Sequence, residues 1–196
     1  MSDTQKKLQY SLKICLITWF IFGYDSMLTA QEHRLKKTKI NRELSLSVPA
    51  SLMTMSDGQR IQKYVSNREP IAMYTSGDGM VDFGINVNSS NWTTGDYDIL
   101  RQFYRSGILN LYDDVDFYRD TIQYINDRPY ISFEFRGTLY AKEDSFRSNQ
   151  SLSKYVYISY TLKDEKVLLF NFSAPYALRH EWRPVADEIM QSIEIK

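Results

Sequence analysis

The side chains best suited to chemistry are charged groups around one predicted pair of strands. Glu134 and Arg136 alternate with apolar residues and so share a strand face, and Arg119 and Asp120 lie on the strand predicted to pair with it. A cluster of charges on a sheet face covered by a helix is a candidate site for a hydrolase or a ligand-binding enzyme, because buried charges need partners and have shifted pKa values. The same residues also suit cross-strand ion pairs on an exposed face, which stabilise little, and we favour this interpretation.

A metal site has less support in the sequence than this cluster of charged groups. His33 and His180 lie far apart and form no ligand motif. Asp113, Asp114 and Asp116 are the densest acids, but a calcium loop also needs a glycine and a distal glutamate. We interpret these acids as a solvated loop that begins a strand. The sequence therefore indicates neither a cofactor nor a metal site.

A glycine-rich turn at 77–79 carries Asp78 and is followed by Asp82. A phosphate-binding loop would continue into a helix and carry Lys-Ser or Lys-Thr, and this one does neither. We therefore interpret the segment as a hairpin turn.

Strands and turns dominate the chain. Alternation of apolar and polar residues predicts strands at 44–48, 71–76, 80–88, 115–125, 129–140, 155–162 and 167–173. Ile193 and Ile195 alternate as in a further short strand. Most joins are tight turns and no strand–helix–strand alternation occurs, which favours an α+β protein with a largely antiparallel sheet over a doubly wound nucleotide-binding fold.

Two segments have the apolar spacing of amphipathic helices. The last helix places five residues on one face: Trp182, Val185, Ala186, Ile189 and Met190. Because it directly follows a hairpin, we expect it to lie across the sheet. The earlier helix, capped by Thr94 or Asp96, carries a stripe of Ile99, Leu100, Phe103 and Tyr104 and frays at Gly107. A weaker short helix is predicted after Asp57, which could cap it.

The N-terminus differs from the rest. Three lysines precede the apolar run 14–23, and Ala30 offers a small residue at a break, which is the pattern of a secretory signal peptide. The run is too short to span a bilayer comfortably, since that takes roughly 20 residues. We predict a signal peptide at 1–30, a linker at 31–42 and one domain at 43–196. An uncleaved anchor and a buried strand are the alternatives for the apolar run.

Charge and cysteine content narrow the class of protein. Lys plus Arg and Asp plus Glu are both 24, so nothing in the net charge suggests nucleic acid, and a membrane is expected only through the N-terminal segment. The one cysteine, Cys15, lies within the predicted signal peptide. The mature chain would then have no thiol for a disulfide, a metal or a nucleophile, and a bacterial envelope suits it at least as well as a eukaryotic secretory route.

Aromatic residues near loops are candidates for partner contact. Trp92 lies in the polar loop 89–95, and Tyr97 and Tyr112 bracket the helix that follows. Exposed aromatic side chains are common contact residues in protein interfaces. A loop tryptophan folded onto the core is the alternative. The second predicted loop is 141–151.

Several segments over residues 43–196 resemble the Mog/PsbP-like family, which includes PsbP-related and DcrB-like proteins. They are LSLSVP, AMYTSGDGMVDFGINV, INDRPYISFEF, YVYISYTLKDEKVLLFNFSAP and WRPVADEIMQSIEI. The resemblance is one of element order and hydrophobic spacing. It implies an antiparallel sheet with helices packed on both faces and a binding or assembly role without shared catalytic machinery. No residue carries over as a site.

Two functions follow as hypotheses. The first is a non-enzymatic, exported binding or accessory protein of the bacterial envelope that presents loops 89–95 and 141–151 to a protein partner. The second is a hydrolase or small-ligand-binding enzyme with a polar site at Glu134 and Arg136, which requires a pocket there.

Overall fold

The computed structural model describes residues 33–64, 69–141 and 151–196. The predicted signal peptide at 1–30 and most of the predicted loop 141–151 lie outside the described residues. The strands are β1 (Leu35–Lys39), β2 (Leu44–Pro49), β3 (Leu52–Thr54), β4 (Ala72–Ser76), β5 (Asp82–Ser89), β6 (Asp114–Ile125), β7 (Arg128–Leu139), β8 (Leu152–Lys163), β9 (Lys166–Pro175) and β10 (Glu194–Ile195). The helices are α2 (Asp57–Lys63), α3 (Tyr97–Leu111), η1 (Tyr176–Leu178) and α4 (Arg179–Gln191).

Two antiparallel sheets contain these strands. The larger has seven strands in the order β3-β4-β5-β9-β8-β7-β6, and the smaller has three in the order β1-β2-β10. Consecutive strands form the predicted hairpins β4–β5, β6–β7 and β8–β9. Asn126 and Asp127, with φ of 47° and 62°, and Asp164 and Glu165, with φ of 50° and 56°, turn two of them. Positive φ at both central residues matches the twist of paired strands, which explains the tight joins.

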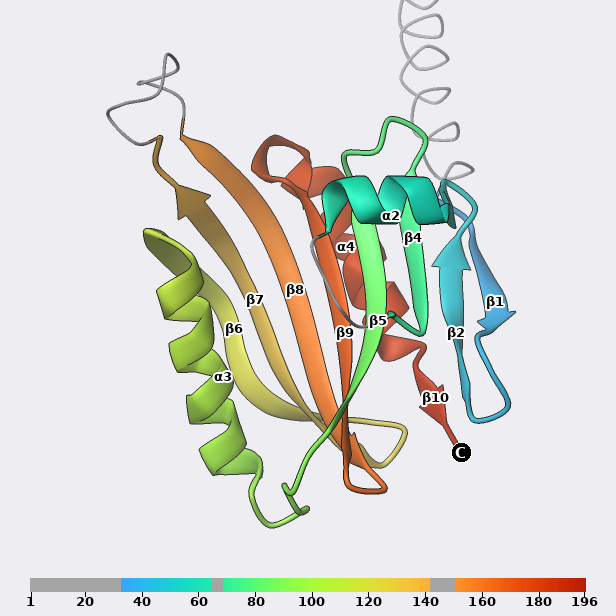
Figure 1. The fold of residues 1–196 in the computed structure, drawn as a ribbon, viewed down its shortest axis with the longest axis vertical. Helices are drawn as coiled ribbons and strands as arrows, with labels where there is room; N and C mark the ends of the chain where they lie inside the picture. The colour runs from blue at the N-terminus through green and yellow to red at the C-terminus, as the bar shows by residue number, and fades with distance from the viewer. Residues whose placement is uncertain (1–32, 65–68, 142–150) are drawn as a thin grey trace, which may run out of the picture.

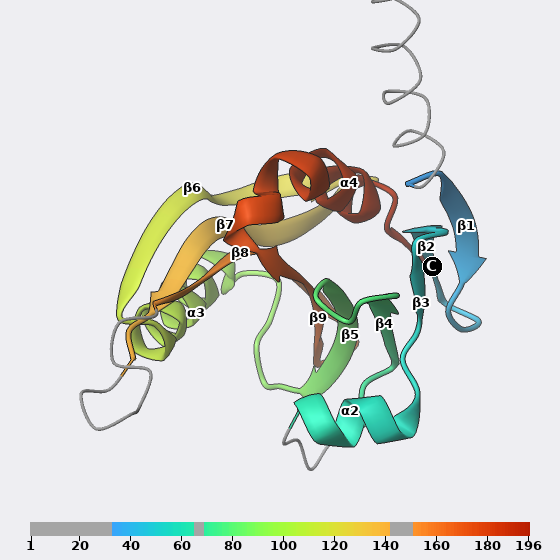
Figure 2. The ribbon, with the colours of Figure 1, turned by 90° about the horizontal axis from the view of Figure 1, so that it is seen from above.

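Helices cover both faces of the larger sheet, as Figure 2 shows with α4 on one side and α2 and α3 on the other. On β7, Ile131, Phe133 and Phe135 are buried in the core that includes α3. Their neighbour Tyr130 is buried in the core that includes α4. Strand alternation directs successive side chains to opposite faces, and both faces are covered, so β7 and β8 are buried along most of their length. The predicted α+β architecture is confirmed.

Helix α4 is confirmed, whereas α3 differs from its prediction. All five residues of the predicted α4 stripe are buried. In α3, Tyr97, Leu100 and Ile108 are buried, while Ile99 and Phe103 are 59% and 60% exposed. The stripe is thus rotated relative to the predicted one, and the helix continues past Gly107 to Leu111. Among the residues described, no helix combines the length and the apolar character needed to cross a bilayer.

The N-terminal part of the described chain corrects two further predictions. The segment predicted as a linker at 31–42 contains strand β1, which pairs with β2 from Leu35 opposite Pro49 to Lys39 opposite Ser45. Its lysines make it look like a linker, but charged residues are typical of an edge strand because they discourage pairing with other chains. Helix α2 is capped by Ser56 rather than Asp57, through a reciprocal capping box with Gln59.

Candidate functional site

Glu134 lies on β7 beneath α4 and is the most deeply buried charged residue of the predicted site, with 1% of its surface exposed. Arg183 Nε of α4 lies 2.6 Å from Glu134 Oε1. Arg119 Nε of β6 lies 3.6 Å from Oε2. The Tyr155 hydroxyl of β8 donates to Oε1 at 3.2 Å. Four elements therefore meet at one carboxylate.

A β-bulge places Arg119 in this group. The register of β6 against β7 shifts between Phe117 and Arg119, so Phe117 faces Phe135 while Arg119 faces Glu134. An extra residue in one strand moves the following side chains to the other face of the sheet. As a result Arg119 points towards α4, although Phe117, two residues earlier, packs in the core that includes α3.

The network extends from Glu134 across the sheet. Arg119 donates to Asp187 Oδ1 at 2.9 Å and also to the Tyr157 hydroxyl. Gln123 Nε2 donates to the same hydroxyl at 3.1 Å and to Ser132 Oγ at 2.9 Å. Buried polar groups are stable when each has partners, and this network supplies them.

Protonation in this network follows from its contacts. The hydrogen bond to Glu134 raises the pKa of Arg183 above its ordinary value, which keeps the guanidinium charged. Burial, reinforced by the Glu134 carboxylate, raises the pKa of Tyr155, so its phenol stays protonated and donates. The recess beside the cluster is about 320 Å³ and is lined by Arg119, Glu134, Arg183, Pro184 and Asp187. Its buried carboxylate already contacts protein donors from α4, β6 and β8, so Glu134 connects α4 to the sheet.

Two residues predicted to join Glu134 pair with other groups. Arg136 pairs with Asp116 at 2.8 Å and Asp114 at 3.3 Å. Asp120 points to the opposite face and binds Arg101 and Arg105 of α3. Cross-strand ion pairing is therefore confirmed for Arg136, whereas Glu134 is buried and not on an exposed face.

The sequence analysis missed Arg183 and Asp187. They lie four residues apart on a helix expected to cover the sheet, so they share one edge of that helix. This spacing was the available signal for two charged groups facing the strands below.

The other candidate ligands have structural partners. Asp113 Oδ2 accepts from the Tyr140 amide at 2.7 Å. His33 lies 3.0 Å from Glu181 Oε1 and 3.1 Å from Ser51 Oγ, with its ring edge-on to Trp182. His180 is exposed. Within the described ranges, no group of three or more His, Cys, Asp or Glu could hold a metal ion.

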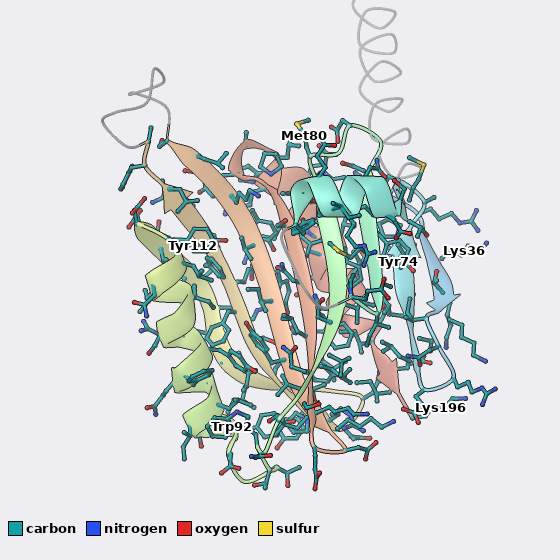
Figure 3. The ribbon with its side chains drawn as sticks, in the orientation of Figure 1. Lys36, Tyr74, Met80, Trp92, Tyr112 and Lys196 are labelled. Carbon is teal, nitrogen blue, oxygen red and sulfur yellow. The ribbon has the colours of Figure 1, made fainter. Side chains whose placement is uncertain are left out.

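The three aromatic residues predicted for partner contact do not form one surface. Trp92 and Tyr112 lie near opposite ends of α3 (Figure 3). Tyr97 is buried, and its hydroxyl accepts from the Leu162 amide at 3.0 Å and bonds Thr161 Oγ1 at 3.2 Å. The prediction of an exposed Tyr97 is therefore wrong, because its side chain anchors α3 to β8.

Tyr112 packs against the sheet. Its ring lies edge-on to Phe135 at 5.6 Å between centroids, and burial raises the pKa of its phenol. It covers Gly137, where an added Cβ would lie only 2.6 Å from two Tyr112 ring atoms. A glycine in a strand often marks such a close approach. Tyr112 therefore serves packing at this position.

We expect Gly137→Ala to lower the free energy of unfolding by about 1–3 kcal/mol, because the methyl group overpacks the strand beneath a ring that Phe135 supports. Urea unfolding followed by circular dichroism measures this. The matched control is Gly107→Ala on α3, where a Cβ meets no atom within 4 Å. Alanine there should raise stability by up to about 1 kcal/mol. Equal stability of Gly137→Ala and the parent protein would contradict the packing described.

Trp92 has an exposed apolar neighbourhood. It is half-buried, because one part of it packs against the core that includes α3, as the alternative interpretation held, and its ring centroid lies 6.2 Å from that of Phe103. Ile99 lies one turn before Phe103 on the same outer side of α3. We call Trp92, Ile99 and Phe103 the α3 apolar surface. Of the three predicted contact residues, only Trp92 belongs to it.

The chain belongs to the α+β class of proteins, and its antiparallel sheet lies between helices. Solved structures with low sequence identity share this arrangement. The cyanobacterial PsbP (CyanoP) from Synechocystis sp. PCC 6803 has a TM-score of 0.57 and 11% identity, over 84% of this chain and 94% of that chain.

Two further solved structures share this fold. The Ran-binding protein Mog1p of Saccharomyces cerevisiae has a TM-score of 0.53 and 10% identity, over 83% of this chain and 96% of that chain. LpqN of Mycobacterium tuberculosis, involved in cell envelope biogenesis, has a TM-score of 0.52 and 11% identity, over 83% of this chain and 91% of that chain. Neither a protein-family model nor a curated protein matches the sequence. The chain therefore has the Mog/PsbP-like fold, as the resemblance to that family implied.

Proposed function

We propose that this chain is a non-enzymatic binding or accessory protein, exported to the bacterial cell envelope, that contacts a protein partner through the α3 apolar surface. Residues 43–196, extended by β1, would form its single binding domain. The N-terminal pattern of lysines, apolar run and Ala30 supports export.

The observation that carries this proposal is the exposure of large apolar side chains beside Trp92. Ile99 and Phe103 are 59% and 60% exposed although α3 buries another face. Neighbouring apolar groups left in water on one helix face are typical of a contact surface, and tryptophan and phenylalanine are enriched there.

Proteins with the same fold support a contact role. Mog1p is a Ran-binding protein, and LpqN is involved in cell envelope biogenesis. The enzyme alternative at Glu134 has weaker support, because Arg183 and Tyr155 already occupy its carboxylate and Arg136 lies in a separate ion pair.

We expect Trp92→Ala and Phe103→Ala each to weaken partner capture about tenfold, because truncating an aromatic anchor costs roughly 1–2 kcal/mol of binding free energy. The measurement is a crosslinked pull-down of the full tagged chain from the envelope fraction of its host. N-terminal sequencing of the captured chain tests cleavage near Ala30 in the same sample.

Met80→Ala is the matched control, since Met80 is 53% exposed and lies at the end of the molecule opposite Trp92 (Figure 3). It should leave capture unchanged, and all three variants should keep their thermal stability to within a few degrees. Equal capture by Trp92→Ala, Phe103→Ala and the parent chain would contradict the contact surface. A chain retained in the cytoplasm would contradict export.

A further inference from the structure

A cavity of about 400 Å³ lies between α2 and strands β4, β5 and β9. It opens on the sheet face opposite α4, where Figure 1 shows α2 in front of β4 and β5, and α3 further along in front of β6. The cavity is therefore separate from both the Glu134 network and the α3 apolar surface. Its size falls in the range of small-molecule sites.

The floor of the cavity is open because of Gly84. Met73, Gly84 and Asn171 lie side by side on β4, β5 and β9. The φ of Gly84 is not in the left-handed region, and an added Cβ would meet Met73 Cε at 3.5 Å, an ordinary contact. Neither the backbone nor the neighbours therefore require glycine here. Such a glycine within a strand is typical of a place where a ligand approaches the backbone.

Uncharged polar groups surround this open floor. Asn86 lies two residues along β5 from Gly84, and Ser173 lies two residues along β9 from Asn171; all line the cavity. The Oδ1 atom of Asn171 is buried and has no hydrogen-bond partner in the part of the chain that the structure describes. An unpaired buried acceptor is costly, and rotation of the amide about its last torsion can present its oxygen or nitrogen to a bound molecule.

The helix above the cavity is held by a buried carboxylate. Asp82, 8% exposed, accepts from Lys63 Nζ at 2.9 Å, from the Tyr64 hydroxyl at 2.7 Å and from Thr75 Oγ1 at 2.6 Å. These bonds tie the end of α2, which forms one wall of the cavity, to β4 and β5. Preorganised walls reduce the entropy lost on binding.

Each charged residue that lines the cavity has a partner of opposite sign. Asp82 is compensated by Lys63, and Arg60 lies 3.0 Å from Asp57 and 3.4 Å from Glu69. What remains for a ligand is a set of amide and hydroxyl groups beside the apolar side chains of Met73 and Pro70. Amides and hydroxyls both donate and accept hydrogen bonds, as the hydroxyls of a polyol do.

We propose that this cavity binds a small, uncharged molecule rich in hydroxyl groups, such as a monosaccharide or a linear polyol. Asn86, Asn171 and Ser173 bind its hydroxyls, and its C–H face packs on Met73 and Pro70. The site stands independently of the proposed function, because it shares no residue with the α3 apolar surface.

The test is a nuclear magnetic resonance titration of the isotope-labelled full chain with glucose and, separately, with sorbitol, at millimolar concentrations. We expect saturable shifts of the backbone amides of Gly84, Asn86, Asn171 and Ser173 with at least one probe. Gly84→Val places a side chain on the floor and should weaken binding at least about tenfold. Asn86→Ala removes a cavity amide without filling the floor and should also weaken it.

Gly107→Ala is the control, because its methyl group lies in open space on α3 and should leave the affinity unchanged. The absence of saturable shifts with both probes would overturn the proposal. An affinity that is unchanged both in Asn86→Ala and in Gly84→Val would also overturn it. Shifts confined to the α3 apolar surface would overturn it as well.

Discussion

Trp182→Ala is expected to lower the free energy of unfolding by about 3–5 kcal/mol, the usual cost of truncating a large aromatic residue in a core. Trp182 is 5% exposed, and its ring centroid lies 5.8 Å from that of Phe172 on β9 and 4.4 Å from that of His33. The substitution removes the residue that joins α4, the sheet and His33, which precedes β1. Urea unfolding followed by circular dichroism measures the loss.

Trp92→Ala is the matched control for this substitution, because it truncates the same residue type where it is half-buried in the loop before α3. We expect a loss of about 1 kcal/mol or less there. Hydrogen exchange should also show lower protection of α4 in Trp182→Ala than in Trp92→Ala. Similar losses in the two variants would mean that α4 does not clamp the sheet.

Arg183→Met is expected to cost about 2 kcal/mol of unfolding free energy, because it leaves the Glu134 carboxylate, 1% exposed, with only Arg119 at 3.6 Å as its cationic partner. The cost is below that of breaking a fully buried pair, since the Arg183 side chain is 47% exposed and reaches water. Chemical denaturation at neutral pH measures this cost.

A double-mutant cycle separates the interaction between Glu134 and Arg183 from the general destabilisation that each substitution causes by itself. Adding Glu134→Leu to Arg183→Met removes the unpaired buried charge. The double variant should therefore be about 1–2 kcal/mol more stable than the sum of the two single-variant losses predicts. The control is Lys37→Met, which breaks the exposed pair between Lys37 and Glu194 and should cost about 0.5 kcal/mol or less. Strictly additive losses would contradict a coupled network at Glu134.

Local sequence patterns were sufficient to predict the hairpins and the last helix. Alternation in β5, β7, β8 and β9 has a period of two, and two covering layers bury both faces of the central strands. In α4 the five apolar residues at helical spacing are all buried. Alternation and spacing are local properties, so they predicted element order and the fold class correctly.

Other features depend on residues distant in the sequence. The stripe of α3 was misassigned because Ile99 and Phe103 are as apolar as Leu100, and only contact with the sheet decides which side is buried. Strand β1 was missed because its lysines indicate a solvated segment until its pairing with β2 is known. The face of Arg119 depends on the bulge after Phe117, which no alternation pattern shows.

By itself, the sequence determined that this chain forms antiparallel hairpins with a terminal helix packed on them, because hydrophobic spacing and turn residues act over a few positions. Only the tertiary structure decided that Glu134 meets Arg119 and Arg183, that Tyr97 is an anchor, and that Gly84 opens a cavity beside Asn171. Each of these depends on strand register or helix placement, which are set by packing across the whole domain.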